Sequence, residues 1–336
     1  MNGRVEKDTK IFKNIETKLV SYPEFVASWY YYLKANNKTA TSCSDFINKL
    51  TRFLEFINED ISVIVPEDFN ENIITQYFLK VQTKEDGTEM SKSYRQGIWS
   101  CLNNFFNFMY TRKLIPDNYF VLADIKRQKG NDLNEINKHR KLLTQDDFRR
   151  ILAAVDTGVG SAKAKGYQKK YKNRDKAILL LFMSTGMRKT ALEEINVSDI
   201  NFEKHELYTI DKGHKVFTYY LTSEVLEIID KWLTDRYFLL GREDKGALFI
   251  SQEGTRMHGK SIARVVDKYA YEALGYHISP HKLRSGFGSI LYEQKHDIEY
   301  VRRAMGHSQV TTTQRYIVTN NDEQKTAASM ISGMLF

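Results

Sequence analysis

The chain has 336 residues, of which 42% are hydrophobic and 27% charged, enough for about two domains at roughly 150 residues each. Its 50 Lys and Arg against 42 Asp and Glu leave a net charge of +8, which favours a polyanionic partner. The longest apolar run, Ala177–Met183, is too short to span a bilayer, and the charged N-terminus lacks the apolar stretch of a secretory signal. Cys43 and Cys101 lack metal-ligand spacing, which argues against a disulfide framework and a Cys-based zinc site. We therefore expect a soluble, cytoplasmic protein without membrane contact.

The first third of the chain has a helical pattern. Residues 1–18 are polar and too few for a domain, so we treat them as a short N-terminal segment. Between residues 19 and 123 apolar side chains recur at helical spacing, as at Phe46, Leu50 and Phe53, and a second such stretch begins near Ser91. This pattern predicts an all-helical domain of about four helices.

Residues 124–141 are polar throughout and are interpreted as an interdomain linker. A helix is expected to begin directly afterwards, because Thr144 and Asp147 have the spacing of a capping box. The remaining domain, residues 142–336, is expected to be mainly helical with a small antiparallel sheet. Its β-like runs at 206–210 and 216–221 flank a basic turn and predict a hairpin, and helical patterns follow at 223–238, 260–274, 280–293 and 297–305.

Four short motifs in this second domain carry reactive or cationic side chains. They are Arg188 in STGMR, Lys212 in the DKGHK turn, His281 and Arg284 in SPHKLR, and His307 and Tyr316 in MGHSQVTTTQRY. Each motif alone has an ordinary explanation, such as a surface arginine or a lysine at a hairpin tip. His281 and Arg284 leave the same face of one helix, whose start Ser279 is expected to cap, and such a pair suits a phosphate oxygen.

Taken together, these six residues occur in an order that resembles the tyrosine recombinase (phage integrase-like) family. The separations also agree: Lys212 comes 24 positions after Arg188, His307 comes 23 positions after Arg284, and Tyr316 comes nine positions after His307. The resemblance covers residues 141–336 through motifs and the preceding helical domain through architecture only. It implies a helical core-site DNA-binding domain followed by an α+β catalytic domain.

The resemblance also implies a mechanism. Tyr316 would attack a scissile DNA phosphate to give a 3′-phosphotyrosyl link, while Arg188 and Arg284 clamp the non-bridging oxygens. Lys212 would protonate the leaving 5′ oxygen, His281 would exchange the tyrosine proton, and His307 would donate to the phosphate. No metal ion and no other cofactor is expected, because the phosphotyrosyl bond retains the energy of the diester.

The sequence departs from the family pattern at two places. Ala191 stands where the family usually has an acidic residue, three positions after the first arginine, although Glu193 and Glu194 follow and are candidates to replace it. The strand after Lys212 reads VFTYYL and lacks the usual Arg and Pro. Neither departure changes one of the six residues.

Two basic regions are candidates for contacts with the DNA backbone. Residues 157–174 contain no acidic residue and are expected to form a loop with interleaved tyrosines; their cationic side chains are Lys163, Lys165, Lys169, Lys170, Lys172 and Arg174. The alternative is a surface loop with no ligand. Lys92 and Arg95, expected on the polar side of a helix, are the candidates in the first domain, and here the alternative is a solvated helix face.

The resemblance further implies a homotetramer that exchanges strands between two double-stranded DNA sites through a Holliday junction. The apolar stripe Ala327, Met330, Ile331, Met334 and Leu335 is a candidate to dock on a neighbouring subunit, or to pack on its own domain. We favour integration or excision of a mobile element. Resolution of chromosome or plasmid dimers, DNA inversion, a type IB topoisomerase-like activity and a catalytically silent DNA-binding regulator remain as alternatives.

Overall fold

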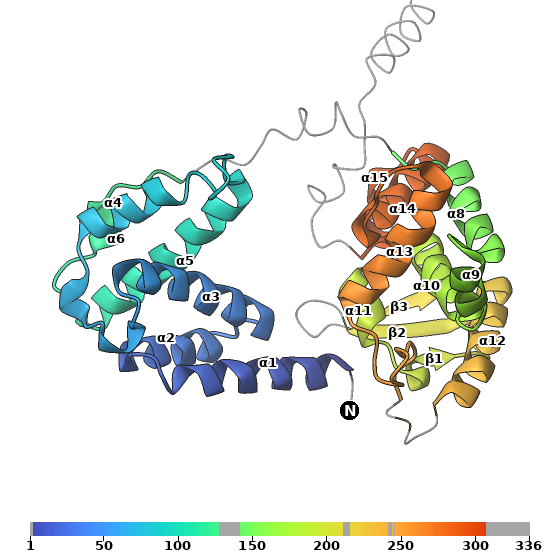
Figure 1. The fold of residues 1–336 in the computed structure, drawn as a ribbon, viewed down its shortest axis with the longest axis horizontal. Coiled ribbons are helices and arrows are strands. Elements are labelled where there is room, and N and C mark those ends of the chain that lie inside the picture. Colours follow the sequence, from blue (N-terminus) through green and yellow to red (C-terminus); the bar gives the residue numbers. More distant parts are fainter. Residues whose placement is uncertain (1–2, 128–141, 211–215, 241–243, 245, 307–336) are drawn as a thin grey trace, which may run out of the picture. The chain divides into compact units, whose positions relative to one another are not determined.

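The computed structural model describes residues 3–127, 142–210, 216–240, 244 and 246–306. Apart from its first four residues, the chain forms two compact units, residues 5–132 and residues 133–336 (Figure 1). Among the described residues, no helix is both long and apolar enough to cross a membrane.

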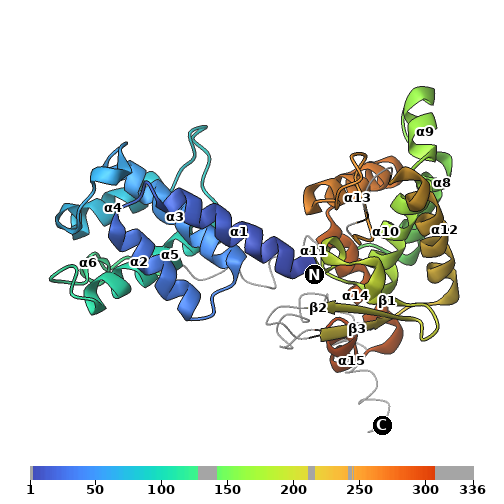
Figure 2. The same ribbon diagram turned by 90° about the horizontal axis from the view of Figure 1, so that it is seen from below.

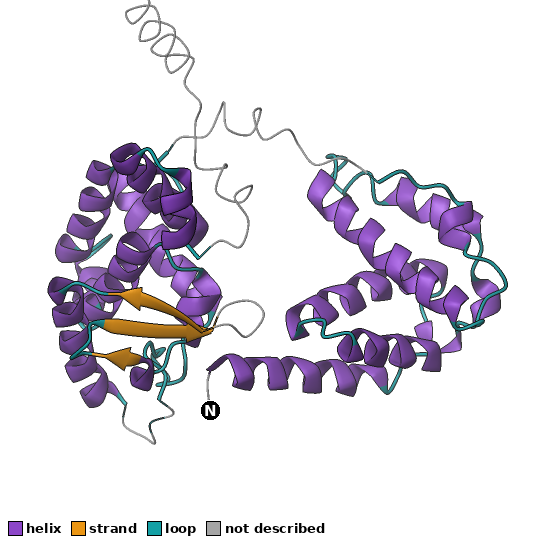
Figure 3. Cartoon of the chain, turned by 180° about the vertical axis from the view of Figure 1, so that it is seen from behind, coloured by secondary structure: helices purple, strands orange, loops and turns teal. Residues whose placement is uncertain are grey.

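The first unit is helical (Figure 3). It contains most of α1 (Gly3–Leu19) and all of α2 (Glu24–Ala35), α3 (Ala40–Ile57), α4 (Glu71–Lys80), α5 (Lys92–Thr111) and α6 (Tyr119–Leu122), with 3₁₀ turns at Ile61–Val63 and Pro66–Asp68. Side-chain caps start several of these helices: the Oγ atom of Ser91, for example, accepts from the backbone N of Tyr94 at 3.3 Å.

Aromatic rings fill the core of the first unit. Phe69 lies at its centre, with ring centroids 5.5 Å from Phe106, 5.9 Å from Phe105 and 6.3 Å from Phe53. Trp29 packs edge-on against Phe105 and donates from Nε1 to Oδ1 of Asn104 at 3.0 Å. Edge-to-face packing of this kind adds to the gain from burying the rings, so α2, α3 and α5 are held by one continuous aromatic cluster.

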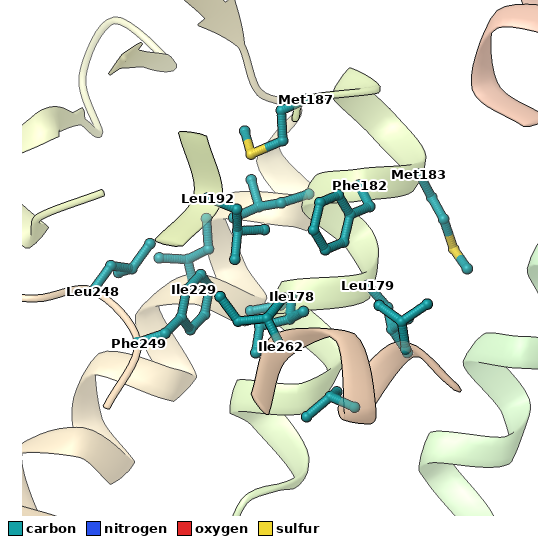
Figure 4. Packing of buried hydrophobic residues seen from close by; sticks show 14 of the residues in the cluster. Ile178, Leu179, Phe182, Met183, Met187, Leu192, Ile229, Leu248, Phe249 and Ile262 are labelled. Carbon is teal, nitrogen blue, oxygen red and sulfur yellow. The ribbon is translucent and has the colours of Figure 1, made fainter. Parts of the chain in front are cut away.

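The second unit is larger and carries the sheet. Its helices are α8 (Gln145–Thr157), α9 (Ala162–Lys169), α10 (Lys172–Thr185), α11 (Lys189–Glu194), α12 (Ser223–Leu239), α13 (Gly259–Leu274), α14 (Pro280–Lys295) and α15 (Ile298–Ala304), with a 3₁₀ turn at Val197–Asp199. The central helix is α10, which contacts α8, α12, α13 and α14. Its apolar run supplies Ile178, Leu179 and Phe182 to the buried cluster in Figure 4.

The sheet has three antiparallel strands in the order β1 (Ile200–Asn201), β2 (Glu206–Ile210) and β3 (Val216–Tyr220). The register pairs Leu207 with Tyr219 and Ile210 with Val216. The pair Ile210–Val216 is the last of the ladder, directly before and after residues 211–215. This antiparallel pairing of consecutive strands confirms the predicted hairpin.

The predicted fold class is confirmed, and so are the capping box and the main helices of the second unit. The Oγ1 atom of Thr144 accepts from the N–H of Asp147 at 3.2 Å, and the Asp147 carboxylate accepts from the N–H of Thr144 at 2.9 Å. The N-terminal segment differs from the expectation. Residues 3–19 form a helix, whose Ile15 and Leu19 are buried in the aromatic core that the sequence pattern placed after residue 18.

Candidate active site

Arg188 follows a tight turn between two helices. Helix α10 ends at Thr185, and Gly186 adopts the left-handed conformation with φ of 59°, the usual conformation of a helix C-cap glycine. The N–H of Met187 donates to the Oγ1 atom of Thr185 at 3.2 Å, and the side chains of Met187 and Leu192 join the buried cluster (Figure 4). Arg188 is the N-cap residue of α11 and is partly exposed.

His281 and Arg284 lie in the first turns of α14, as predicted. Pro280 is the first helical residue, where its missing N–H removes no helical hydrogen bond. Ser279 is the N-cap residue, but its side chain makes no capping bond; its carbonyl instead accepts from the N–H of Lys282 at 2.8 Å. His281 is exposed, whereas Arg284 is only 2% exposed.

The buried guanidinium of Arg284 joins three parts of the site. Nη1 donates to the carbonyl of Gly186, two residues before Arg188, and Nη2 donates to the carbonyl of Met305 at 2.8 Å. Met305 itself precedes Gly306 and the predicted His307. Arg284 therefore links α14, the turn that carries Arg188 and the end of α15, and two charge-assisted bonds fix the plane of its guanidinium.

Phe287 supports the same turn, and the sequence reading did not single it out. A Cβ atom at Gly186 would collide with the Phe287 ring. Phe287 also packs against Val301 of α15 and against Met305, the C-cap residue of that helix. Phe287 lies three residues after Arg284, on the same side of α14. That spacing from Arg284 is the one feature of the sequence from which Phe287 could have been found.

Three of the six predicted catalytic residues, Lys212, His307 and Tyr316, lie outside the described residues. The strands on either side of Lys212 and the helix that precedes His307 are described. The structure thus brings together the elements that carry Arg188, His281 and Arg284.

Glu193 of α11, one of the two acidic residues that follow Ala191, lies next to the start of α13. An oxygen of Glu193 lies 3.8 Å from Nδ1 of His258, the N-cap residue of α13, where a helix N-terminus favours negative charge. Arg256 donates to the carbonyls of Glu193 and Ile195 at 3.1 and 3.0 Å and so fixes the end of α11. Nothing in the sequence distinguished Arg256 from other arginines.

The expected basic loop at 157–174 is wrong as a loop, because most of it is helical. Ser161 caps α9 by accepting from the N–H of Ala164 at 3.3 Å. The side chain of Gln168 then bonds both the N–H and the carbonyl of Val159, at 3.0 and 2.7 Å. Lys163, Lys165, Lys169 and Lys170 are all exposed on or next to this helix, which projects from the unit in Figure 2.

Arg174 and Tyr171 of the same stretch are buried and belong to the packing of the second unit. Arg174 is buried, donates from Nε and Nη2 to Oδ1 of Asp175 at 3.0 and 2.9 Å, and lies over the Tyr171 ring. The other Asp175 oxygen accepts from Lys268 and Tyr269 at 3.1 and 3.0 Å. Burial, together with the charge and hydrogen bond of Asp175, raises the pKa of the Tyr269 hydroxyl. Arg174 is therefore removed from the set of candidate DNA contacts.

In the first unit, Lys92 and Arg95 differ in how far their side chains are exposed to solvent. Lys92 is exposed at the start of α5. The side chain of Arg95 is only 11% exposed and donates from Nη2 to Oε1 of Glu89 at 2.5 Å, so the expected place on the polar side of the helix is wrong for Arg95. It lines a cavity of about 210 Å³ with Phe78 and Trp99.

Within the described residues, no three His, Cys, Asp or Glu side chains gather closely enough to hold a metal ion.

Comparison with known proteins agrees with these features. Residues 141–323 match the phage integrase family. Tyrosine recombinase XerC of Vibrio cholerae serotype O1 is 33% identical over 242 residues, which are 71% of this chain and 70% of that protein.

Several solved structures share the fold. The XerH site-specific recombinase bound to its difH substrate superposes with a TM-score of 0.64 at 19% identity, over 88% of this chain and 81% of that one. The Tn1549 transposon integrase in complex with circular intermediate DNA gives 0.59 at 18% identity, over 90% and 98%. Since the family match spans more than half of the chain and the XerC match exceeds two thirds of both proteins, this chain belongs to the phage integrase family and is a tyrosine site-specific recombinase that cleaves and rejoins DNA.

Proposed function

We propose that this recombinase integrates or excises a mobile DNA element in the cytoplasm, with Tyr316 as the nucleophile and Arg188, Lys212, His281, Arg284 and His307 as its partners. The observation that carries the assignment is the buried guanidinium of Arg284, hydrogen-bonded to the carbonyls of Gly186 and Met305. Three motifs distant in the sequence meet at that one group.

The proposed reaction is a transesterification. The oxygen of Tyr316 forms a bond to the scissile phosphorus, the bond to the 5′ oxygen breaks, and the energy of the diester is conserved for the second exchange. His281 accepts the tyrosine proton and Lys212 supplies one to the leaving oxygen. Arg188 and Arg284 stabilise the charge on the non-bridging oxygens, and a guanidinium whose orientation is fixed beforehand needs little reorganisation in the transition state.

DNA contacts are proposed in both units. The four exposed lysines on or next to α9 are suited to phosphate oxygens, as is Lys92 at the start of α5. Arg95 is retained only as a residue that supports this end of α5, because of its bond with Glu89. We assign core-site binding to the unit of residues 5–132 and catalysis to the unit of residues 133–336.

Assembly is proposed as a homotetramer on two recombination sites, in which the apolar stripe of residues 327–335 docks on a neighbouring subunit. A lambda integrase tetramer bound to a Holliday junction shares the fold, with a TM-score of 0.57 at 15% identity. Removal of residues 325–336 is then expected to leave binding to a single site intact and to abolish synapsis of two sites in native gels. Normal synapsis by the shortened chain would refute the docking.

Covalent trapping tests the assignment of Tyr316. Wild type and Tyr316→Phe are each mixed with nicked duplexes from the DNA that flanks the gene, in buffer with chelator, and separated on denaturing gels. Wild type alone is expected to give a protein–DNA adduct, because only the phenol can form the 3′-phosphotyrosyl bond. An adduct from both proteins would place the nucleophile elsewhere. No adduct from either, despite tight binding, would favour the silent regulator.

The position of the adduct tests the biological role. The Tn1549 transposon integrase, which shares the fold, was solved with circular intermediate DNA. If this chain acts on a mobile element in the same way, cleavage is expected at both ends of a segment that contains its gene. The second candidate is resolution of chromosome or plasmid dimers, for which cleavage is expected at a single site remote from the gene. The match to XerC proteins is the observation that keeps this candidate open.

A further inference from the structure

Phe217 on β3 lies at a junction between the sheet and the end of α15. Its backbone pairs with Thr209 of β2, whose hydroxyl donates to the Phe217 carbonyl at 3.3 Å. The ring packs against the core of the second unit and, edge-on, against Tyr219, with ring centroids 4.7 Å apart. The strand and its ring are thus held in place from the sheet side.

The same ring closes on Gly306, the residue after the last turn of α15. Gly306 has a φ of 63° and donates its N–H to the Arg303 carbonyl at 3.1 Å. A Cβ atom built on Gly306 would lie 2.8 Å from Cε2 of Phe217 and 3.2 Å from Cδ2 and Cζ. Gly306 is therefore required both for its left-handed conformation and because the ring leaves no room for a side chain.

Two groups consequently contact the backbone of Met305 and Gly306, the two residues directly before His307 in the sequence. Nη2 of Arg284 binds the carbonyl of Met305 at 2.8 Å, and the Phe217 ring covers Gly306. A glycine left to itself has wide backbone freedom, and the direction of the next residue depends on its φ and ψ. Contact with the ring restricts that freedom at the peptide that leads to His307.

The ring also belongs to the hairpin whose turn contains Lys212, five residues earlier in the chain. We propose that Phe217 is a positioning residue for DNA cleavage: it joins the hairpin of Lys212 to the Gly306 turn and thereby sets the approach of His307 to the scissile phosphate. This inference rests on the proposed role of His307. It arises from the VFTYYL strand, where this chain departs from the pattern of its family.

The test measures cleavage and binding separately. Phe217→Ala is compared with Tyr220→Ala, which removes an aromatic side chain from the same strand where it is 75% exposed. At saturating nicked duplex, Phe217→Ala is expected to slow adduct formation about ten- to hundredfold, since small misplacements in an active site carry losses of this order. The Kd for the duplex is expected to stay within about twofold of wild type, and Tyr220→Ala to behave as wild type. Phe217→Leu, which keeps part of the contact, is expected to recover part of the rate.

A double-mutant cycle identifies the route of the effect. If Phe217 acts through His307, Phe217→Ala adds little further loss to a His307→Ala protein, because residues that act as a unit are not additive. Full additivity, a wild-type rate in Phe217→Ala, or equal losses in rate and binding that Phe217→Leu does not relieve would each overturn the inference. Absence of an adduct from wild type would instead refute the proposed function, so the two failures are distinct.

Discussion

At the scale of single residues, the site depends on glycines that other residues cannot replace. Gly186 and Gly306 each have positive φ, each lies against a phenylalanine ring, and each is followed within two residues by a predicted catalytic side chain. The rings come from α14 and β3. Backbone conformation and side-chain packing therefore act together at the turn that carries Arg188 and at the end of α15.

Gly186→Ala tests this dependence. The substitution meets both the cost of a left-handed alanine, about 1 kcal/mol, and a collision with the Phe287 ring, about 1–3 kcal/mol as for overpacking in a core. The control is Gly275→Ala, at the C-cap of α13, where φ is 75° and no atom lies within 4 Å of the new Cβ. Urea unfolding is expected to show the larger loss of stability for Gly186→Ala. Equal losses would show that packing against Phe287 contributes nothing, and Phe287→Ala in the same chain is expected to relieve only the steric part.

At the scale of elements, apolar periodicity predicted the helices that pack with a buried face. α3, α5 and α12–α14 all carry such a face, and turn chemistry located the hairpin. Helix α1 was missed although Ile11, Ile15 and Leu19 recur every four residues, because charged residues dominate the segment. Helix α9 was missed because it has no apolar face and contains Gly166; its caps and the Gln168 bonds supply what periodicity does not show. Two partners of Arg284 are backbone carbonyls, which no residue pattern encodes.

The link between α12 and the segment after it has a predictable pH dependence. Arg236, buried on α12, donates from Nη1 and Nη2 to the two oxygens of Asp244 at 2.8 and 2.5 Å and from Nε to the Ala247 carbonyl. The Arg236 hydrogen bonds hold the pKa of the Asp244 carboxyl below its ordinary value, against the opposing effect of burial. A carboxyl with a lowered folded-state pKa stabilises the fold above its unfolded pKa of about 3.9. That stability is lost as the pH falls through the folded pKa.

Asp244→Asn is therefore expected to lower the thermal midpoint at pH 7 by about 1–3 °C, for a loss of about 1 kcal/mol or less because the Asp244 side chain is half exposed. The difference from wild type is expected to shrink below about pH 4 and to vanish near pH 2. The control is Asp230→Asn on the same helix, where the carboxylate is exposed. A difference that stays constant from pH 7 to pH 3 would mean that the charge of Asp244 does not contribute.

At the scale of the whole molecule, the structure shows where part of the surplus positive charge is exposed. The net charge of +8 only indicated a polyanionic partner, whereas the structure shows that Arg174 is buried and that the lysines of α9 are exposed. The order of six residue types in the sequence was enough to predict the family, which the comparisons confirm. The roles of the six residues stay predictions, and three of them lie outside the described residues.

Salt dependence of DNA affinity separates the α9 lysines from net charge alone. Each phosphate contact releases counterions and contributes about 0.9 to the slope of log K against log salt. If α9 lies on the DNA backbone, Lys163, Lys165, Lys169 and Lys170 all changed to Gln should lower that slope by about 2–4. The control changes four exposed lysines elsewhere in the same unit, Lys204, Lys231, Lys260 and Lys295, to Gln and so removes the same charge. Equal slopes for the two variants would mean that net charge alone explains the change, and would exclude α9 as a DNA contact. A lower slope for the α9 variant alone would place the duplex along this helix.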